Sequence, residues 1–173
     1  MSTLLRDIHS QIVYFPRAIV LSVVLLPGYL FFTTDKSQRK ESIISALRQP
    51  WLLLYLIYLS FLLVSTLFSR PPTNPLRNVL NNFGLYNVNG VNMECIENTL
   101  LFVPYSFFYL QTSRYSSPFK SALVVSICTT MFIEFSQLIF WLGEFQVSDL
   151  LHNVIGGMIG FVLWQIKEVL IYK

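Results

Sequence analysis

The stretch WLLLYLIYLSFLLVSTLF, residues 51–68, decides the fold class of this chain. It contains no charged residue, and a helix needs about 20 mainly apolar residues to cross the hydrocarbon core of a membrane. Trp51 and Tyr55 lie near one end, as aromatic residues do at a membrane interface. We therefore predict a membrane-spanning helix from Pro50 to Ser69.

The composition of the whole chain agrees with that helix. Hydrophobic residues make up 54% of the 173 residues and charged residues only 12%, whereas soluble domains carry about 25% charged residues. The mean hydropathy is +0.56. We predict one domain over residues 1–173, with an all-α fold: a polytopic helical bundle embedded in the membrane.

Four further stretches are apolar enough to be membrane spans, which gives about five in all. The first carries Pro27 and Gly28 as a predicted kink, and the third is interrupted by Pro104. The predicted spans are residues 13–33, 50–69, 97–111, 119–142 and 150–167.

The distribution of lysine and arginine predicts the orientation, because cytoplasmic connectors carry an excess of both. With five spans, eight of the 12 basic residues fall on one side and four on the other. We predict that the N-terminus is outside, that the C-terminus is cytoplasmic, and that the Asn-rich loop of residues 70–97 is outside. The net charge of +3 lies in short connectors and does not indicate nucleic-acid binding.

Glu134 is the most informative polar residue, because an acid inside a span costs about 2.5–3.5 kcal/mol on insertion scales. It lies fourteen residues after Lys120, hence about 21 Å along the helix from the inner end. Thr130 and Gln137 share its helix face. Two interpretations remain open: a lined pocket or proton-binding site, and hydrogen bonds between helices worth roughly 0.6–2 kcal/mol each.

More polar residues are predicted to meet Glu134 in the outer half of the membrane. Asp149 and Asn153 lie four residues apart on one face, where Asp149 either caps the helix or joins a pocket. His152 lies between them, but one His and one Asp are too few ligands for a metal site. We expect neither a metal nor a cofactor. The candidate pocket residues are Glu97, Asn98, Glu134, Gln137, Asp149 and Asn153.

Three glycines in the last span form the pattern GGxxG. Small residues at this spacing let another helix approach closely. We predict that Gly156, Gly157 and Gly160 serve helix packing. Cys95 and Cys128 lie far apart, and we interpret them as unrelated free thiols.

Several of these motifs together resemble the VanZ-like family, small membrane proteins named for a teicoplanin-resistance factor. The resemblance begins at NPLRNV (residues 74–79) and is strongest over 74–162. It rests on ENTLLFVPYSFF (97–108), FIEFSQLIF (132–140) and SDLLHNVIGGMIG (148–160). The chain departs from the family pattern at three places: Ser106 replaces a glycine, Gln146 replaces an additional Asp, and Leu142-Gly143 lies where many relatives carry an Arg.

The resemblance implies lowered susceptibility to teicoplanin-class glycopeptides, through an outer-leaflet polar pocket and without a known reaction. The expected partners are membrane lipid and either a lipid-linked cell-wall precursor or a lipophilic glycopeptide. Two alternatives are an intramembrane enzyme acting on such a precursor, with Glu134 and Asp149 as acid and base, and a proton-coupled transporter. No nucleophile–base pair is visible, and the sequence names neither catalytic residues nor an oligomeric state.

Overall fold

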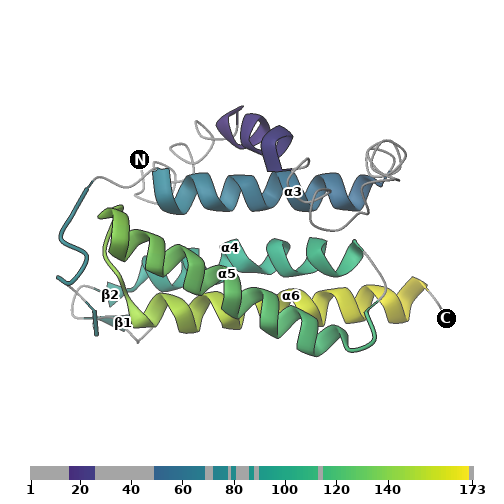
Figure 1. Ribbon diagram of the computed structural model, residues 1–173. Coiled ribbons are helices and arrows are strands. Elements are labelled where there is room, and N and C mark those ends of the chain that lie inside the picture. The colour runs from purple at the N-terminus through teal and green to yellow at the C-terminus, as the bar shows by residue number, and fades with distance from the viewer. Residues whose placement is uncertain are drawn as a thin grey trace. The chain divides into compact units, whose positions relative to one another are not determined.

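The computed structural model describes residues 16–25, 49–68, 72–77, 79–80, 86–87, 90–112 and 115–171. The chain divides into two compact units, Met1–Ser69 and Arg70–Lys173. Apart from one pair of two-residue strands, the regular structure of the described residues is helical (Figure 1). This confirms the predicted all-α fold class.

The first unit contains the helix Pro16–Leu25 and α3, Pro50–Leu63, which continues as the π-helical turn η2, Val64–Phe68. Proline suits the first helical position because its missing N–H would have no partner there. Residues 50–67 have a mean hydropathy of 1.9 and are long enough to cross a membrane. Of the predicted first span, residues 16–25 are described, and the predicted kink at Pro27-Gly28 lies outside the described residues.

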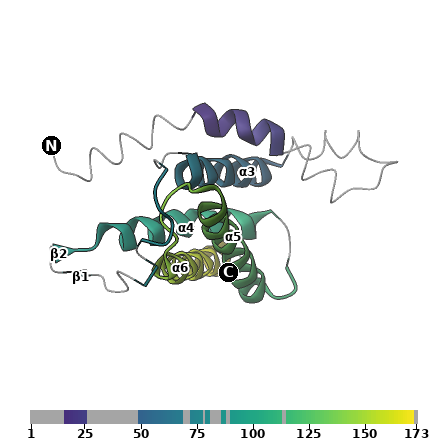
Figure 2. The same cartoon turned by 60° about the vertical axis from the view of Figure 1, so that its left-hand side comes forward.

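The second unit begins with strands β1, Tyr86–Asn87, and β2, Gly90–Val91, which pair antiparallel. Three helices follow: α4, Met93–Gln111; α5, Pro118–Phe140; and α6, Val147–Ile171. Helices α4 and α6 both start at the end where the strands lie, and α5 runs in the opposite direction (Figure 1). The three helices remain side by side when the molecule is turned (Figure 2).

The helix bounds differ from the predicted spans mainly at α4 and α6. Helix α4 begins at Met93 rather than at residue 97, and Pro104 lies inside it without ending it. Helix α6 extends at both ends beyond the predicted 150–167. Helices α5 and α6 are long and apolar enough to cross a membrane, with mean hydropathies of 1.8 and 1.7. Helix α4 is not apolar enough to be counted with these helices, because polar residues such as Glu97 and Asn98 lower its mean hydropathy.

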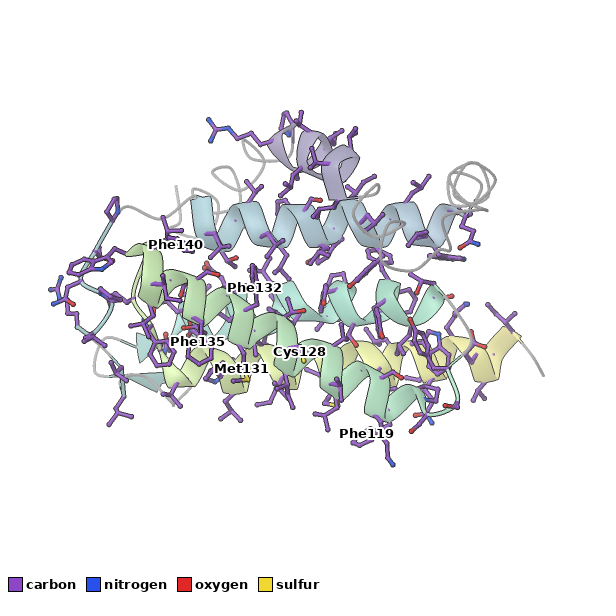
Figure 3. All side chains as sticks on the ribbon, viewed as in Figure 1. Phe119, Cys128, Met131, Phe132, Phe135 and Phe140 are labelled. Atoms are coloured by element: carbon purple, nitrogen blue, oxygen red, sulfur yellow. The ribbon has the colours of Figure 1, made fainter. Side chains whose placement is uncertain are left out.

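Helix α5 carries its polar residues inside the bundle and its apolar residues outside. Its buried residues are Ala122, Ser126, Thr130, Ile133, Glu134, Ser136 and Gln137. Its outward side chains include Phe119, Cys128, Met131, Phe132, Phe135 and Phe140, labelled in Figure 3. This arrangement is the reverse of a helix on a water-soluble protein, whose polar face is the outer one. It is the arrangement expected where lipid surrounds the helix.

Helices α4 and α6 run parallel and lie close together from Gly156 to Lys167 of α6. A Cβ atom on Gly156 would overlap the carbonyl oxygen of Thr99, and one on Gly160 would overlap that of Val103. Further along, Lys167 Nζ donates to Gln111 Oε1 at 2.8 Å, a pair 56 residues apart in sequence. The glycine contacts follow nearly the same offset, so the two helices stay in one register. The glycines therefore pack α6 against its neighbours.

Candidate functional site

The connector between α5 and α6 turns sharply and brings the chain back to Glu134. Trp141 ends α5 in the left-handed conformation (φ 58°), and Gly143 has φ 136°, which side chains other than glycine rarely adopt. Three residues after Gly143, the backbone N–H of Gln146 donates to Glu134 Oε2 at 3.0 Å. Glu134 is only 1% exposed. The carboxylate therefore fixes the connector to α5 from inside the bundle.

One turn below Glu134, α5 is joined to α6 by a buried side-chain hydrogen bond. Asn153 Nδ2 donates to Thr130 Oγ1 at 2.8 Å. Both residues are buried, as is Gln137 one turn above on the same face. The predicted polar face of α5 thus contacts the predicted polar face of α6.

Asp149 lies in the first turn of α6 and is buried, with 4% exposure. Its backbone N–H donates to the carbonyl oxygen of Gln146 at 3.1 Å. His152, also buried, lies 2.7 Å through Nδ1 from the carbonyl oxygen of Ser148. Because a carbonyl can only accept, Nδ1 carries the proton in this contact. These contacts lie within the first turns of α6. The close approach to α4 begins at Gly156, where a Cβ would overlap the carbonyl oxygen of Thr99.

The N-terminus of α6 lies beside the buried acids Asp149 and Glu134, whereas the acid in the first turn of α4, Glu94, is exposed. Helices α4 and α6 begin at the same end, and each has an acid in its first turn, Glu94 and Asp149. Glu134 accepts the N–H that immediately precedes α6. The partial positive charge of a helix N-terminus stabilises a nearby carboxylate by about 0.3–1 kcal/mol, and by up to about 2 kcal/mol when partly buried. This offsets part of the cost of placing acids inside the bundle.

Asn98 and Asn153 occupy one level of the bundle on facing helices. Lys167 on α6 contacts Gln111 on α4, which lies 56 positions earlier in the sequence. The same difference in position places Asn153 level with residue 97, next to Asn98. Asn98 is 6% exposed and Asn153 is 4% exposed. Among the described residues, Asn98 Nδ2 and Asn153 Oδ1 have no hydrogen-bond partner. Asn98 therefore does not donate to a carboxylate among the described residues.

The loop that precedes α4 also reaches this end of the bundle. Phe145 N–H donates to the carbonyl of Pro75 at 2.9 Å, and Val147 N–H donates to that of Val79 at 3.1 Å. The segment NPLRNV therefore pairs with the connector that carries Gln146. Glu97, by contrast, is only half-buried. All four sequence segments that carry the family resemblance contribute residues to this end of the second unit.

The structure adds polar residues that the sequence analysis did not single out as site residues. Tyr105 hydroxyl and Thr129 Oγ1 are 2.5 Å apart, which links α4 to α5. Ser106 and Ser126 are fully buried near Gly157. Ser126 lies four residues before Thr130, so extending the polar face by one helical turn from Glu134 would have found it.

The described side chains offer no set of metal ligands. No three His, Cys, Asp or Glu residues among them lie together in a way that would hold an ion. What the cluster offers is carboxylate, amide and hydroxyl groups in a setting with little water. Such groups bind polar headgroups or protons through hydrogen bonds.

Comparison with known proteins identifies the family of this chain. A protein-family model, described as VanZ/LLP1, matches residues 19–168. Neither the curated proteins nor the solved structures include a significant match. The family match covers far more than half of the chain, and three described helices are long and apolar enough to cross a membrane. The chain belongs to the VanZ/LLP1 family of membrane proteins.

Proposed function

We propose that this protein lowers susceptibility to teicoplanin-class glycopeptides, through the buried polar cluster at the shared start of α4 and α6. The observation that carries the proposal is the group formed by Glu134, Asp149 and Asn153, all at least nine-tenths buried. An ionisable group kept inside a membrane protein usually serves function, because it is costly to place there. The VanZ-like resemblance supplies the phenotype.

The proposed topology has five membrane crossings, with the N-terminus outside and the C-terminus cytoplasmic. The polar cluster then lies beneath the outer surface, where cell-wall intermediates and glycopeptides meet the membrane. Lys120 and Lys167 lie at the opposite end of α5 and α6. This supports a cytoplasmic placement of that end, because cytoplasmic connectors carry an excess of basic residues.

Cysteine labelling tests this orientation. Glu144 lies in the connector at the polar end, and Lys120 lies in the first turn of α5. In a Cys128→Ser background, we expect Glu144→Cys to react with a membrane-impermeant maleimide in intact cells. Lys120→Cys should react only after the membrane is permeabilised.

The background without an added cysteine serves as the control, since Cys95 is buried and should stay unlabelled. Labelling at position 120 in intact cells, with position 144 protected, would place the polar cluster on the cytoplasmic side. The proposed route to glycopeptides would then be wrong.

A susceptibility assay tests the function itself. We expect Glu134→Gln, Asp149→Asn and Asn153→Ala each to reduce the protection against teicoplanin by about tenfold. Removing a hydrogen bond costs about 1.5–3 kcal/mol where one group is charged, as at Glu134, and about 0.5–1.5 kcal/mol between neutral groups, as between Asn153 and Thr130. A change of about 1.4 kcal/mol is tenfold in an equilibrium constant. Minimum inhibitory concentrations are measured at equal protein abundance in the membrane.

Glu168→Gln is the matched control, because Glu168 is a partly exposed acid near the other end of α6. It should keep full protection. If Glu134→Gln also keeps full protection at equal abundance, the cluster has no part in the phenotype. If turnover of a lipid-linked cell-wall intermediate depends on both Glu134 and Asp149, the enzyme alternative replaces the proposal.

A further inference from the structure

We propose that the side-chain amides of Asn98 and Asn153 together bind one hydroxyl group inside the bundle. The inference rests on the proposed function, because it names the chemistry that the polar cluster receives. Asn98 Nδ2 is a buried donor and Asn153 Oδ1 a buried acceptor, and neither has a hydrogen-bond partner among the described residues. Both side chains are more than nine-tenths buried.

Such atoms are costly to leave empty, because burial removes their hydrogen bonds to water and nothing replaces them. Native proteins contain few of them, and each calls for a water, an ion or a ligand. Here the two atoms lie at one level of parallel helices, by the register that Gly156, Gly160 and Lys167 define. A single small group between α4 and α6 is therefore the simplest occupant.

The chemistry of the two amides selects a hydroxyl. A phosphate or carboxylate only accepts and leaves Asn153 Oδ1 empty, and an ammonium only donates and leaves Asn98 Nδ2 empty. A hydroxyl donates and accepts at once. The selection depends on the orientation in which Asn153 Nδ2 donates to Thr130. With the Asn153 amide turned over, both open atoms would be donors, and a carboxylate or phosphate oxygen would satisfy them as well as a hydroxyl.

The close approach of α4 and α6 also favours a hydroxyl over a larger group with both functions, such as a peptide amide. Thr99 directly follows Asn98, and Gly156 lies three residues after Asn153. A Cβ on Gly156 would overlap the carbonyl oxygen of Thr99, so the two helices are in close contact beside the two amides. Toward the membrane surface, Asn98 lies only five residues from the start of α4, about 7.5 Å. A headgroup hydroxyl or a single water reaches that depth.

The sign of a stability change tests the inference. Asn98→Leu is made in purified full-length protein and unfolding is measured in lipid nanodiscs. An empty site predicts that leucine stabilises the protein, because it removes a buried unpartnered donor. An occupied site predicts the opposite, with the unfolding equilibrium constant raised about tenfold. Gln165→Leu, an exposed amide on α6, controls for adding leucine and should change little.

Two lipids distinguish the sources of the hydroxyl. Phosphatidylglycerol and phosphatidylethanol carry the same charge, but only the first has free headgroup hydroxyls. Stabilisation by phosphatidylglycerol alone, lost in both Asn98→Leu and Asn153→Leu, identifies a headgroup hydroxyl. Destabilisation by Asn98→Leu to the same extent in both lipids identifies a bound water.

A stabilised Asn98→Leu protein would overturn the inference, whichever lipid surrounds it. These measurements use no antibiotic, so their outcome is separate from that of the susceptibility assay. If the purified protein binds a hydroxyl but cells carrying Asn98→Leu show unchanged susceptibility, the hydroxyl site stands and its role in the proposed function is rejected.

Discussion

Replacing Gly156 with valine should remove nearly all folded protein from the membrane. The Cβ of any side chain at this position overlaps the carbonyl oxygen of Thr99, which belongs to the backbone of α4 and cannot rotate away. Overpacking a well-packed contact costs about 1–3 kcal/mol and occasionally more. Valine adds two further carbons to the overlap. Folded abundance, measured by resistance to proteolysis in isolated membranes, reports the loss.

Gly157 provides the matched comparison within the same motif. Its Cβ would overlap Ser126, a side chain on α5 rather than a backbone atom. Gly157→Ala should therefore be rescued by Ser126→Gly, whereas no side-chain change on α4 should rescue Gly156→Val. Normal abundance of Gly156→Val would show that α4 and α6 do not pack as described.

The helices could be predicted from the sequence, because the patterns that indicate them are local. An uncharged run such as residues 51–68 has few alternatives to a spanning helix. The start of α4 was placed four residues late, at Glu97 rather than Met93. Hydropathy marks where a chain becomes apolar, whereas a helix begins where its backbone hydrogen bonds begin.

The contacts of the polar residues could not be predicted as well, because they depend on the register between helices. Periodicity places Thr130, Glu134 and Gln137 on one face of α5, and all three are buried there. No local pattern indicates that Glu134 accepts the backbone N–H of Gln146, since the bond depends on the turn at Trp141 and Gly143. Whether the buried residues form a functional pocket stays a prediction that the susceptibility assay addresses.

The packing role of the glycines was predicted from spacing alone, but their neighbours were not. GGxxG predicts a close approach without saying to which helix. In the structure, Gly156 and Gly160 meet α4, while Gly157 meets α5. One motif therefore serves two contacts, because adjacent glycines on a helix point about 100° apart.

Replacing Phe132 with lysine should prevent stable insertion of α5. Phe132 is 58% exposed on the apolar face of α5 (Figure 3) and lies near the middle of the 23-residue helix. Lysine at the centre of a spanning helix costs about 2.5–3.5 kcal/mol, whereas phenylalanine contributes about −0.3 to −0.6 kcal/mol. The sum of about 3–4 kcal/mol is large beside the net stability of a small protein. Glycosylation-tag mapping of insertion, or the membrane-bound fraction after alkaline extraction, measures the effect.

Phe140→Lys is the control that makes this a test of lipid exposure rather than of helix packing. Phe140 is the last residue of α5 and is 67% exposed. Both variants replace an exposed phenylalanine of α5 with lysine, and they differ only in the depth of that residue along the helix. A lysine at the helix end extends its ammonium group to the interface at little cost. If lipid surrounds α5, position 132 fails and position 140 is tolerated. If water surrounds it, both lysines are tolerated, and the exposed phenylalanines would instead mark a surface for another protein.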